Sequence, residues 1–194
     1  MTTKDVRHHI LATAEQIISH KGFSAVGINE LLRAANVPKG SFYHYFASKE
    51  AFGVALLKHY FDDYIDQLTQ LFAADTNHPE QPLISYCQQW QHTQSCQSLT
   101  HRCLVVKLAA EVSDLSEAMR QVLNDGMQAI IEVLAGALSK TQIMQQLPGH
   151  PSAEQLAQRI YQLWLGASLQ AKVYHSDEPF ELAMATTQSW LQLA

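Results

Sequence analysis

Apolar residues recur three or four positions apart along most of the chain, which is the spacing of one face of an α-helix. Over residues 4–20 these positions include Val6, Ile10 and Ala14, and Gly22 follows where such a helix would end. No segment alternates with the two-residue period of a strand. The pattern therefore predicts an all-α protein of about nine helices, the others at about residues 27–34, 38–45, 49–73, 83–97, 102–112, 114–140, 152–174 and 178–192.

The second and third predicted helices are short and are separated by a tight turn. Asn36 can adopt the left-handed conformation that such a turn needs, and Pro38 suits the first position of the following helix. Two short helices joined in this way, with a third packed behind them, form the helix-turn-helix layout. We therefore expect a helix-turn-helix DNA-binding domain over residues 1–48, followed by an effector-sensing and dimerisation domain over residues 49–194.

Charge is divided unevenly along the chain. The formal net charge is −5, yet residues 1–60 carry seven Lys and Arg against four Asp and Glu, a balance of +3. The remaining residues carry six basic and fourteen acidic side chains, a balance of −8. A basic N-terminal segment on an acidic body confines attraction for phosphate to one end of the molecule.

The cellular compartment is suggested by what the sequence lacks. Its three cysteines are an odd and sparse set, which argues against a secreted disulfide framework. No apolar run approaches the roughly 20 residues that a membrane span requires, and the N-terminus lacks the layout of a secretory signal. We expect a cytoplasmic protein with no membrane partner.

The third predicted helix carries polar side chains suited to DNA. In a helix-turn-helix this helix enters the major groove, where its exposed side chains meet base edges and phosphates. Gly40 would let the backbone approach DNA, while Phe42 and Phe46 face inward and anchor the helix. From spacing alone, a short aromatic helix is more simply part of a core. The candidate reading side chains are Lys39, Ser41, Tyr43 and His44.

The order of residues is more specific than their spacing. The strings GF at 22–23, INELL at 28–32, VPKGSFYHYF at 37–46 and SKEAF at 48–52 closely resemble the signature of the TetR family over about residues 6–56. The resemblance implies an all-helical homodimeric regulator, usually a repressor, whose C-terminal domain senses a small molecule. It also implies that double-stranded DNA is read, at bases or nearby phosphates, by Lys39, Ser41, Tyr43 and His44, and gripped at its backbone by Tyr45 and Lys49.

The same resemblance gives the last two predicted helices a role in dimerisation. It implies that they form a four-helix interface with the same helices of a second copy. A two-fold dimer would bind a palindromic operator whose half-sites are one DNA turn apart, roughly 34–36 Å. The apolar residues expected to contribute are Leu156, Ile160, Leu163, Leu169, Leu182 and Trp190.

Cysteines in a reducing compartment are commonly inert and buried, but the setting of Cys103 is suggestive. It directly follows His101 and Arg102, and it precedes Lys107 by one helical turn near the start of a predicted helix. Cationic neighbours and a helix N-terminus favour the thiolate, which is the reactive form of cysteine. Cys103 is therefore the candidate sensing thiol.

A second resemblance supports this assignment. CLxVKLxAEVxDLSE from Cys103 and LWLGAxLQAK ending at Lys172 look like the NemR-type regulators, TetR-family members that respond to reactive electrophiles and oxidants through cysteine. The resemblance implies that Cys103 is the sensing thiol and that Lys172 is its functional partner. An ammonium near a thiol would lower the pKa of that thiol. Cys87 and Cys96 have no such matched setting and are auxiliary at best.

Non-covalent sensing is the alternative mode of induction. Aromatic residues of the C-terminal domain could line an apolar cavity for a flat ligand. Aromatics at helical spacing are more often core than ligand box. The candidate lining residues are Phe72, Tyr86, Trp90, Tyr161, Trp164 and Tyr174.

A metal site is a further alternative. His92, Cys96, His101 and Cys103 offer the ligand types that zinc and copper prefer. Their spacing matches no established site, and His101 and Cys103 would need a bend in the chain to converge. We therefore expect neither a metal nor a cofactor.

Enzymatic activity is the contrasting class of function. The sequence has no glycine-rich phosphate loop, no Gly-x-Ser-x-Gly elbow and no His-Glu-x-x-His motif. Glu111 and Asp114 lie on an acidic helical stretch and are more simply part of a solvated face than a catalytic pair. We expect a binding protein and not an enzyme.

Overall fold

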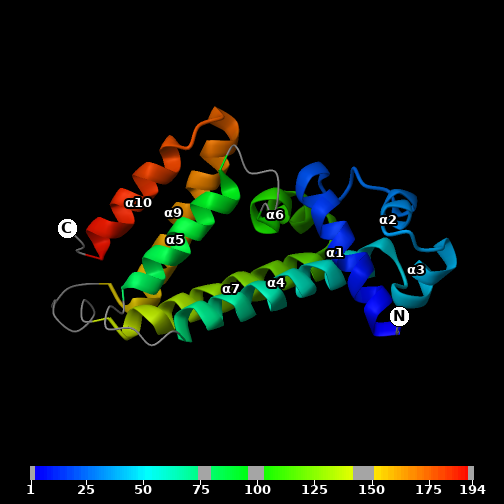
Figure 1. Ribbon diagram of the computed structural model, residues 1–194, viewed down its shortest axis with the longest axis horizontal. Helices are drawn as coiled ribbons and strands as arrows, with labels where there is room; N and C mark the ends of the chain where they lie inside the picture. The colour runs from blue at the N-terminus through cyan, green and yellow to red at the C-terminus, as the bar shows by residue number, and fades with distance from the viewer. Residues whose placement is uncertain (1–2, 74–79, 96–102, 142–150, 192–194) are drawn as a thin grey trace. The chain divides into compact units, whose positions relative to one another are not determined.

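The computed structural model describes residues 3–73, 80–95, 103–141 and 151–191, and within these residues it contains nine helices and no strand (Figure 1). The all-α prediction is confirmed. Among the described residues, none of the helices has the length and apolar character needed to cross a lipid bilayer. The helices are α1 (Thr3–Lys21), α2 (Ile28–Ala34), α3 (Lys39–Tyr45), α4 (Lys49–Ala73), α5 (Gln81–Gln94), α6 (Leu104–Leu115), α7 (Glu117–Ser139), α9 (Ala153–Tyr174) and α10 (Glu178–Trp190).

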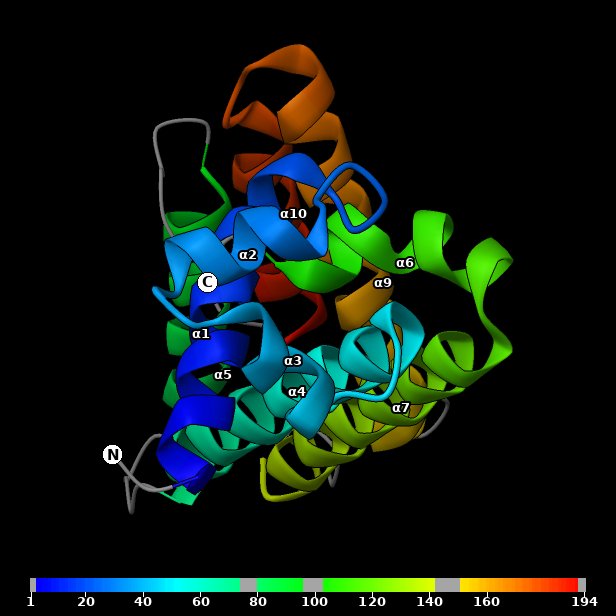
Figure 2. The same ribbon diagram turned by 90° about the vertical axis from the view of Figure 1, so that its right-hand side faces the viewer.

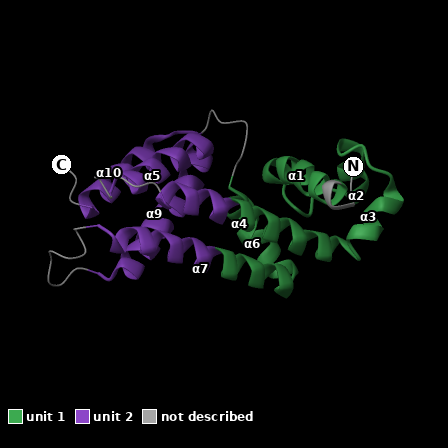
Figure 3. Cartoon of the chain, turned by 60° about the horizontal axis from the view of Figure 1, so that its bottom comes forward, with its two compact units in different colours: residues 1–63, 100–126 green, residues 64–99, 127–194 purple. Residues whose placement is uncertain are grey.

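The chain divides into two compact units (Figure 3). Unit 1 comprises residues 1–63 and 100–126, and unit 2 comprises residues 64–99 and 127–194. The first parts of α4 and α7 therefore belong to unit 1, together with α1, α2, α3 and α6. These units are defined by packing, and the functional boundary expected at residue 48 stays a prediction.

Unit 1 is built around α1, which packs against α2 and α6 (Figure 2). Ile10, Leu11 and Ala14 are at most 1% exposed, as the helical spacing of the apolar positions in this segment predicts. In the part of unit 1 contributed by α4 and α7, a Cβ atom at Gly126 would overlap the ring of Phe61. A glycine at this position therefore lets the backbone of α7 approach the aromatic ring closely.

Unit 2 is organised around α9, which packs against α5 and α10. The helix begins with a capping box, in which the Ser152 hydroxyl and the Gln155 side chain satisfy each other's backbone N–H groups. Two buried indole N–H groups are also satisfied: Trp90 donates to Ser168 Oγ at 2.8 Å, and Trp164 donates to Thr187 Oγ1 at 3.0 Å. Each bond links α9 to a different neighbouring helix.

Thr187 gives a direct test of this packing. A Thr187→Val substitution keeps the shape of the side chain but leaves the buried indole N–H of Trp164 without its acceptor. We expect the free energy of unfolding to fall by about 1–3 kcal/mol, measured by urea unfolding at fixed protein concentration. The matched control is Thr186→Val. Like Thr187, Thr186 donates to a carbonyl of its own helix, Leu182 O at 2.8 Å, but in the described contacts it accepts no bond from another helix. Equal losses in the two variants would contradict the prediction.

Candidate functional site

The turn between α2 and α3 has the geometry that a helix-turn-helix requires. Asn36 has φ +52°, in the left-handed region, as the sequence predicts. The N–H of Val37 donates to Leu32 O at 3.0 Å and closes the turn. Pro38 was expected at the first position of α3, but its ψ of 146° is extended and it stands one residue before the helix as the N-cap. It therefore directs the chain into α3 without belonging to it.

The seven-residue helix α3 is held in place by aromatic side chains. Phe42 is 0% exposed, and its ring centre lies 5.2 Å from that of Phe46 and 5.4 Å from that of Phe52 at the start of α4. The ring of Tyr43 meets Phe42 edge-on at 5.5 Å and is itself 53% exposed. Since a helix of this length is not stable alone, these ring contacts fix where its outer face lies.

The outer face of α3 presents most of the predicted reading residues. Lys39, Gly40, Tyr43 and His44 are exposed, and Ser41 is partly exposed. No atom lies within 4 Å of the position that a Cβ on Gly40 would occupy, so packing inside the protein does not require a glycine there. At Gly40 this face is therefore open, and the backbone of α3 is accessible there. The contacts of these residues with DNA stay a prediction.

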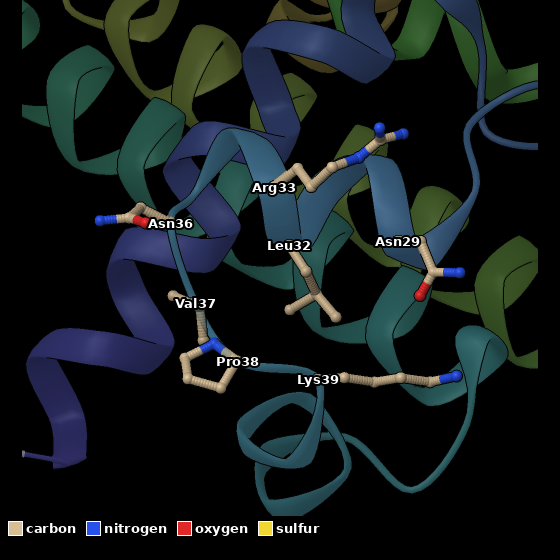
Figure 4. Close-up of a pocket in the computed structure, with 7 residues that line it drawn as sticks. All are labelled: Asn29, Leu32, Arg33, Asn36, Val37, Pro38 and Lys39. Carbon is tan, nitrogen blue, oxygen red and sulfur yellow. The ribbon is translucent and has the colours of Figure 1, made fainter.

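A polar groove runs between α2 and α3 (Figure 4). It contains two exposed residues that the sequence analysis missed, Asn29 and Arg33, which lie one turn apart on α2. Figure 4 shows the Lys39 side chain extending along the groove toward the side where Asn29 lies. The signal in the sequence was the i, i+4 spacing of two polar side chains on a helix that otherwise buries leucines. The groove is lined by Asn29, Leu32, Arg33, Asn36, Val37, Pro38 and Lys39.

The two residues expected to grip the DNA backbone also contact the protein itself. Lys49 Nζ lies 3.4 Å from the carbonyl oxygen of Ser24 and 5.0 Å from the centre of the Phe23 ring. Tyr45 is partly exposed, with its ring centre 5.0 Å from that of His44. An ammonium has three donors, so Lys49 can bind a phosphate while it keeps its contact with Ser24.

Glu111 of α6 binds the turn that follows α1. Its carboxylate accepts the N–H of Phe23 at 3.1 Å and the N–H of Ser24 at 2.6 Å. Gly22, at φ +92°, would place a Cβ only 2.9 Å from Glu111 Oε2, so a larger residue there would displace the carboxylate. The expectation that Glu111 belongs to a solvated face is wrong, whereas Asp114 is exposed. No local signal could reveal a partner 88 residues away.

The environment of Glu111 favours its charged form. Burial opposes ionisation, but hydrogen bonds from the Ser24 side chain and from the Ser24 and Phe23 amides, together with the charge of Lys107, lower the pKa of Glu111 below 4.5. At the C-terminal end of α6, Ser116 Oγ donates to Oε1 of Glu50, which lies at the start of α4; the distance is 2.5 Å. Within unit 1, hydrogen bonds therefore join α6 both to the α1–α2 turn and to α4.

Cys103 stands at the N-cap of α6 as a partly exposed residue. Tyr60 of α4 donates its hydroxyl proton to Cys103 Sγ at 3.4 Å. Burial of the thiol raises its pKa above 9.0, and the hydrogen bonds from Tyr60 and from the Val106 and Val105 amides offset part of that rise. The helix N-terminus favours the thiolate, as expected, but burial outweighs its effect, and the pKa is raised.

Of the three basic neighbours expected to act on Cys103, Lys107 is the one among the described residues. Lys107 acts on Glu111, whose pKa it lowers, while His101 and Arg102 lie outside the described residues. Lys172 is exposed in the last turn of α9, in unit 2, and its partnership with Cys103 stays a prediction.

The other two cysteines are Cys87 and Cys96. Cys87 is buried in α5, and burial raises the pKa of its thiol to about 12. At neutral pH it is therefore protonated and unreactive. Cys96 lies outside the described residues.

The aromatic residues proposed to line a ligand cavity pack largely against one another. Tyr86, Trp90, Tyr161 and Trp164 are at most 5% exposed. The centre of the Trp90 ring lies 5.6 Å from those of Tyr86 and Tyr161 and 6.3 Å from that of Trp164. Phe72 is partly exposed and lies 6.1 Å from Tyr86, whereas Tyr174 is 64% exposed at the end of α9. This arrangement is that of a core, which was the simpler of the two interpretations.

The metal alternative gains no support from the described residues. Among them, no three His, Cys, Asp or Glu side chains are grouped closely enough to hold an ion. His92 is exposed on α5 and Cys103 begins α6. The other two candidate ligands, Cys96 and His101, fall in the part of the chain that is not described.

An all-helical chain with an exposed α3 behind a tight turn defines a helix-turn-helix transcriptional regulator. Residues 10–56 match the model of the bacterial regulatory proteins of the tetR family, and residues 79–187 match that of the tetracyclin repressor-like C-terminal domain. The chain belongs to the TetR family, as the resemblance in the N-terminal strings predicts.

Individual relatives extend over nearly the whole chain. The HTH-type transcriptional repressor NemR of Escherichia coli is 46% identical over 185 residues, which cover 95% of this chain and 92% of that protein. The transcriptional regulator AcuR of Cereibacter sphaeroides is 31% identical, covering 84% and 74%. Among solved structures, the reduced form of E. coli NemR superimposes with a TM-score of 0.87 at 44% identity, covering 95% of this chain and 96% of that one.

The hydrogen bonds of Glu111 to the α1–α2 turn make the stability of unit 1 depend on pH. Because the folded protein lowers the pKa of Glu111, its contribution is complete above about pH 4.5 and is lost as the pH falls through the lowered value. We expect Glu111→Gln to reduce the free energy of unfolding at neutral pH, and its difference from wild type to shrink below about pH 4.5. Urea unfolding over a pH series measures this, with Asp114→Asn as the exposed control on the same helix. A difference that is independent of pH would contradict the assignment.

Proposed function

We propose that this regulator is a homodimeric repressor that binds a palindromic DNA operator through α3 and leaves it when a reactive electrophile or oxidant modifies Cys103. The observation that carries the proposal is the course of α6 within unit 1. The helix begins at Cys103, and two turns later its Glu111 side chain holds the turn between α1 and α2. A chemical change at the start of α6 therefore has a bonded route to the helix-turn-helix.

DNA reading is assigned to the exposed face of α3. Lys39, Ser41, Tyr43 and His44 contact bases or nearby phosphates, and Gly40 allows the backbone to approach. Tyr45 and Lys49 contact the DNA backbone beside them. The basic balance of the N-terminal segment supplies the long-range attraction, since a formal +3 over residues 1–60 faces a polyanion.

Dimerisation is assigned to the exposed apolar side chains of α9 and α10. Leu169 is 56% exposed and Leu182 is 68% exposed, as large apolar residues at an unoccupied interface would be. Leu156 and Ile160, which the resemblance also implied for the interface, are at most 2% exposed and belong to the core of unit 2. Val173 and Tyr174 of α9, at 65% and 64% exposure, extend the proposed interface.

The proposed chemical step uses the Cys103 sulfur as nucleophile. With N-ethylmaleimide, the thiol gives its proton to water and the sulfur forms a bond to one alkene carbon. The alkene π pair moves to the other carbon, which takes a proton from water. The product is a bulky thioether at the N-cap of α6, where the original thiol accepted the Tyr60 hydrogen bond.

The reading face can be tested by charge removal. We expect Lys39→Gln to weaken binding to the DNA upstream of the protein's own gene and to reduce the slope of log K against log salt by about 1. Gel-shift or fluorescence anisotropy titrations at several salt concentrations measure both effects. Lys140→Gln, at the exposed C-terminal end of α7 in unit 2, is the matched control. Equal salt slopes for the two variants would show that Lys39 does not contact the DNA backbone.

The sensing thiol can be tested by its removal. We expect N-ethylmaleimide and methylglyoxal to release wild-type protein from operator DNA and to leave Cys103→Ala bound. Cys96→Ala serves as the control and should respond like wild type. If Cys103→Ala is released as readily as wild type, covalent sensing at this residue is wrong, and release by a non-covalent ligand becomes the better account.

A further inference from the structure

Cys103 poses a chemical problem that its own helix does not solve. The reactive form of a cysteine is the thiolate, yet burial raises the pKa of this thiol. The N-terminus of α6 helps through the amides of Val105 and Val106, but these amides do not cancel the effect of burial. A further hydrogen bond to this sulfur comes from Tyr60 on α4 of the same unit.

Tyr60 is placed to provide that stabilisation. It lies on α4, is 8% exposed, and its ring packs edge-on against Phe61 with the ring centres 5.3 Å apart. Its hydroxyl oxygen is 3.4 Å from Cys103 Sγ, with the hydroxyl as donor. Because the Tyr60 ring is already held by its burial, its hydroxyl donates to the sulfur without a large further loss of side-chain freedom.

Among the described residues, two basic side chains that lie near this pair in the sequence, Lys107 and His59, have contacts of their own. Lys107, one turn further along α6, acts on the carboxylate of Glu111. His59, which precedes Tyr60 on α4, lies with Nδ1 3.5 Å from Asp63 Oδ2 and packs its ring against His8. The Tyr60 hydroxyl is a neutral donor, and its contribution does not depend on the ionisation of either residue.

We propose that Tyr60 is a positioning residue for the sensing thiol: its hydroxyl fixes the Cys103 sulfur at the start of α6 and stabilises the thiolate that attacks electrophiles. This inference rests on the proposed function of Cys103. It adds a second residue, 43 positions earlier in the chain, that sets how fast the sensor reacts.

A hydrogen bond to a thiolate has two opposite effects on its reaction rate. Removing the bond raises the pKa of the thiol, and a rise of about one unit lowers the thiolate fraction about tenfold at neutral pH. The remaining thiolate becomes more nucleophilic, by about threefold for a Brønsted slope of about 0.4–0.5. The net result is a rate about threefold slower at neutral pH, a gap that closes and then reverses as the thiol ionises fully.

The experiment measures alkylation of Cys103 in Tyr60→Phe over a pH series. Iodoacetamide is the probe: the thiol proton goes to water, sulfur forms a bond to carbon, and the carbon–iodine bond breaks to release iodide. The modified Cys103 peptide is quantified by mass spectrometry, which separates it from Cys87 and Cys96. The control is Tyr64→Phe, one turn further along α4, because Tyr64 acts on Tyr86, whose pKa it helps to raise.

We expect Tyr60→Phe to react about threefold more slowly than wild type at neutral pH and to approach and then overtake it in alkaline solution, while Tyr64→Phe follows wild type. A ring-fluorinated tyrosine at position 60, a stronger donor, should shift the profile in the opposite direction. Thermal unfolding of each variant confirms that it is folded. Profiles that coincide with wild type, or that differ by one factor at every pH, would overturn the proposal and reduce Tyr60 to a packing role.

The same samples separate this inference from the function on which it rests. Fully alkylated wild-type protein is tested for operator binding by gel shift. If it still binds, Cys103 is not the sensor, whatever the profile of Tyr60→Phe shows. If it is released and the Tyr60→Phe profile matches wild type, the sensor stands and the role given to Tyr60 falls.

Discussion

The structure of unit 1 depends on one carboxylate that satisfies the backbone of a distant turn. Glu111 accepts the N–H groups of both Phe23 and Ser24, and Gly22 supplies the space and the left-handed φ that the approach needs. A charge-assisted pair of hydrogen bonds fixes distance and direction together, unlike an apolar contact. The helix that carries Glu111 begins at Cys103, about 12 Å away along the helix axis by its rise per residue. The Cys103 thiol and the contact with the α1–α2 turn therefore belong to the same helix.

The position of α3 is a second constraint, because a helix of this length is not stable alone. With seven residues and no side-chain cap, α3 lies where Phe42 and its aromatic neighbours place it. Its neighbour α4 begins with Lys49 against the Phe23 ring and with Glu50 bonded to Ser116 of α6. The position of the outer face is thus determined by tertiary contacts that converge on the α1–α2 turn and on α6. Such an arrangement can respond to α6 without any direct contact between DNA and the sensing residue.

Features set by neighbouring residues could be predicted from the sequence, whereas contacts between residues far apart in the chain could not. Helical periodicity and the VPKGSFYHYF string were sufficient for the all-α fold, the left-handed Asn36 and the family. Periodicity identifies an apolar face but not what covers it. The resemblance therefore implied a place for Leu156 and Ile160 in the dimer interface, although they are buried in unit 2. Glu111 and Tyr60 were missed for the same reason: their partners lie 88 and 43 residues away, and no spacing rule connects them.

The two described cysteines lie in different surroundings, and these surroundings act on their thiols differently. Burial raises the pKa of the thiol both at Cys87, a buried residue, and at Cys103, a partly exposed one. Burial raises the pKa of Cys87 to about 12, whereas Cys103 also receives hydrogen bonds from Tyr60 and from two helix amides that lower its pKa. A thiol with a raised pKa keeps a small thiolate fraction at neutral pH, so weak electrophiles rarely modify it. The donors around the sulfur then set its reactivity, and they can differ between proteins without any change in α3.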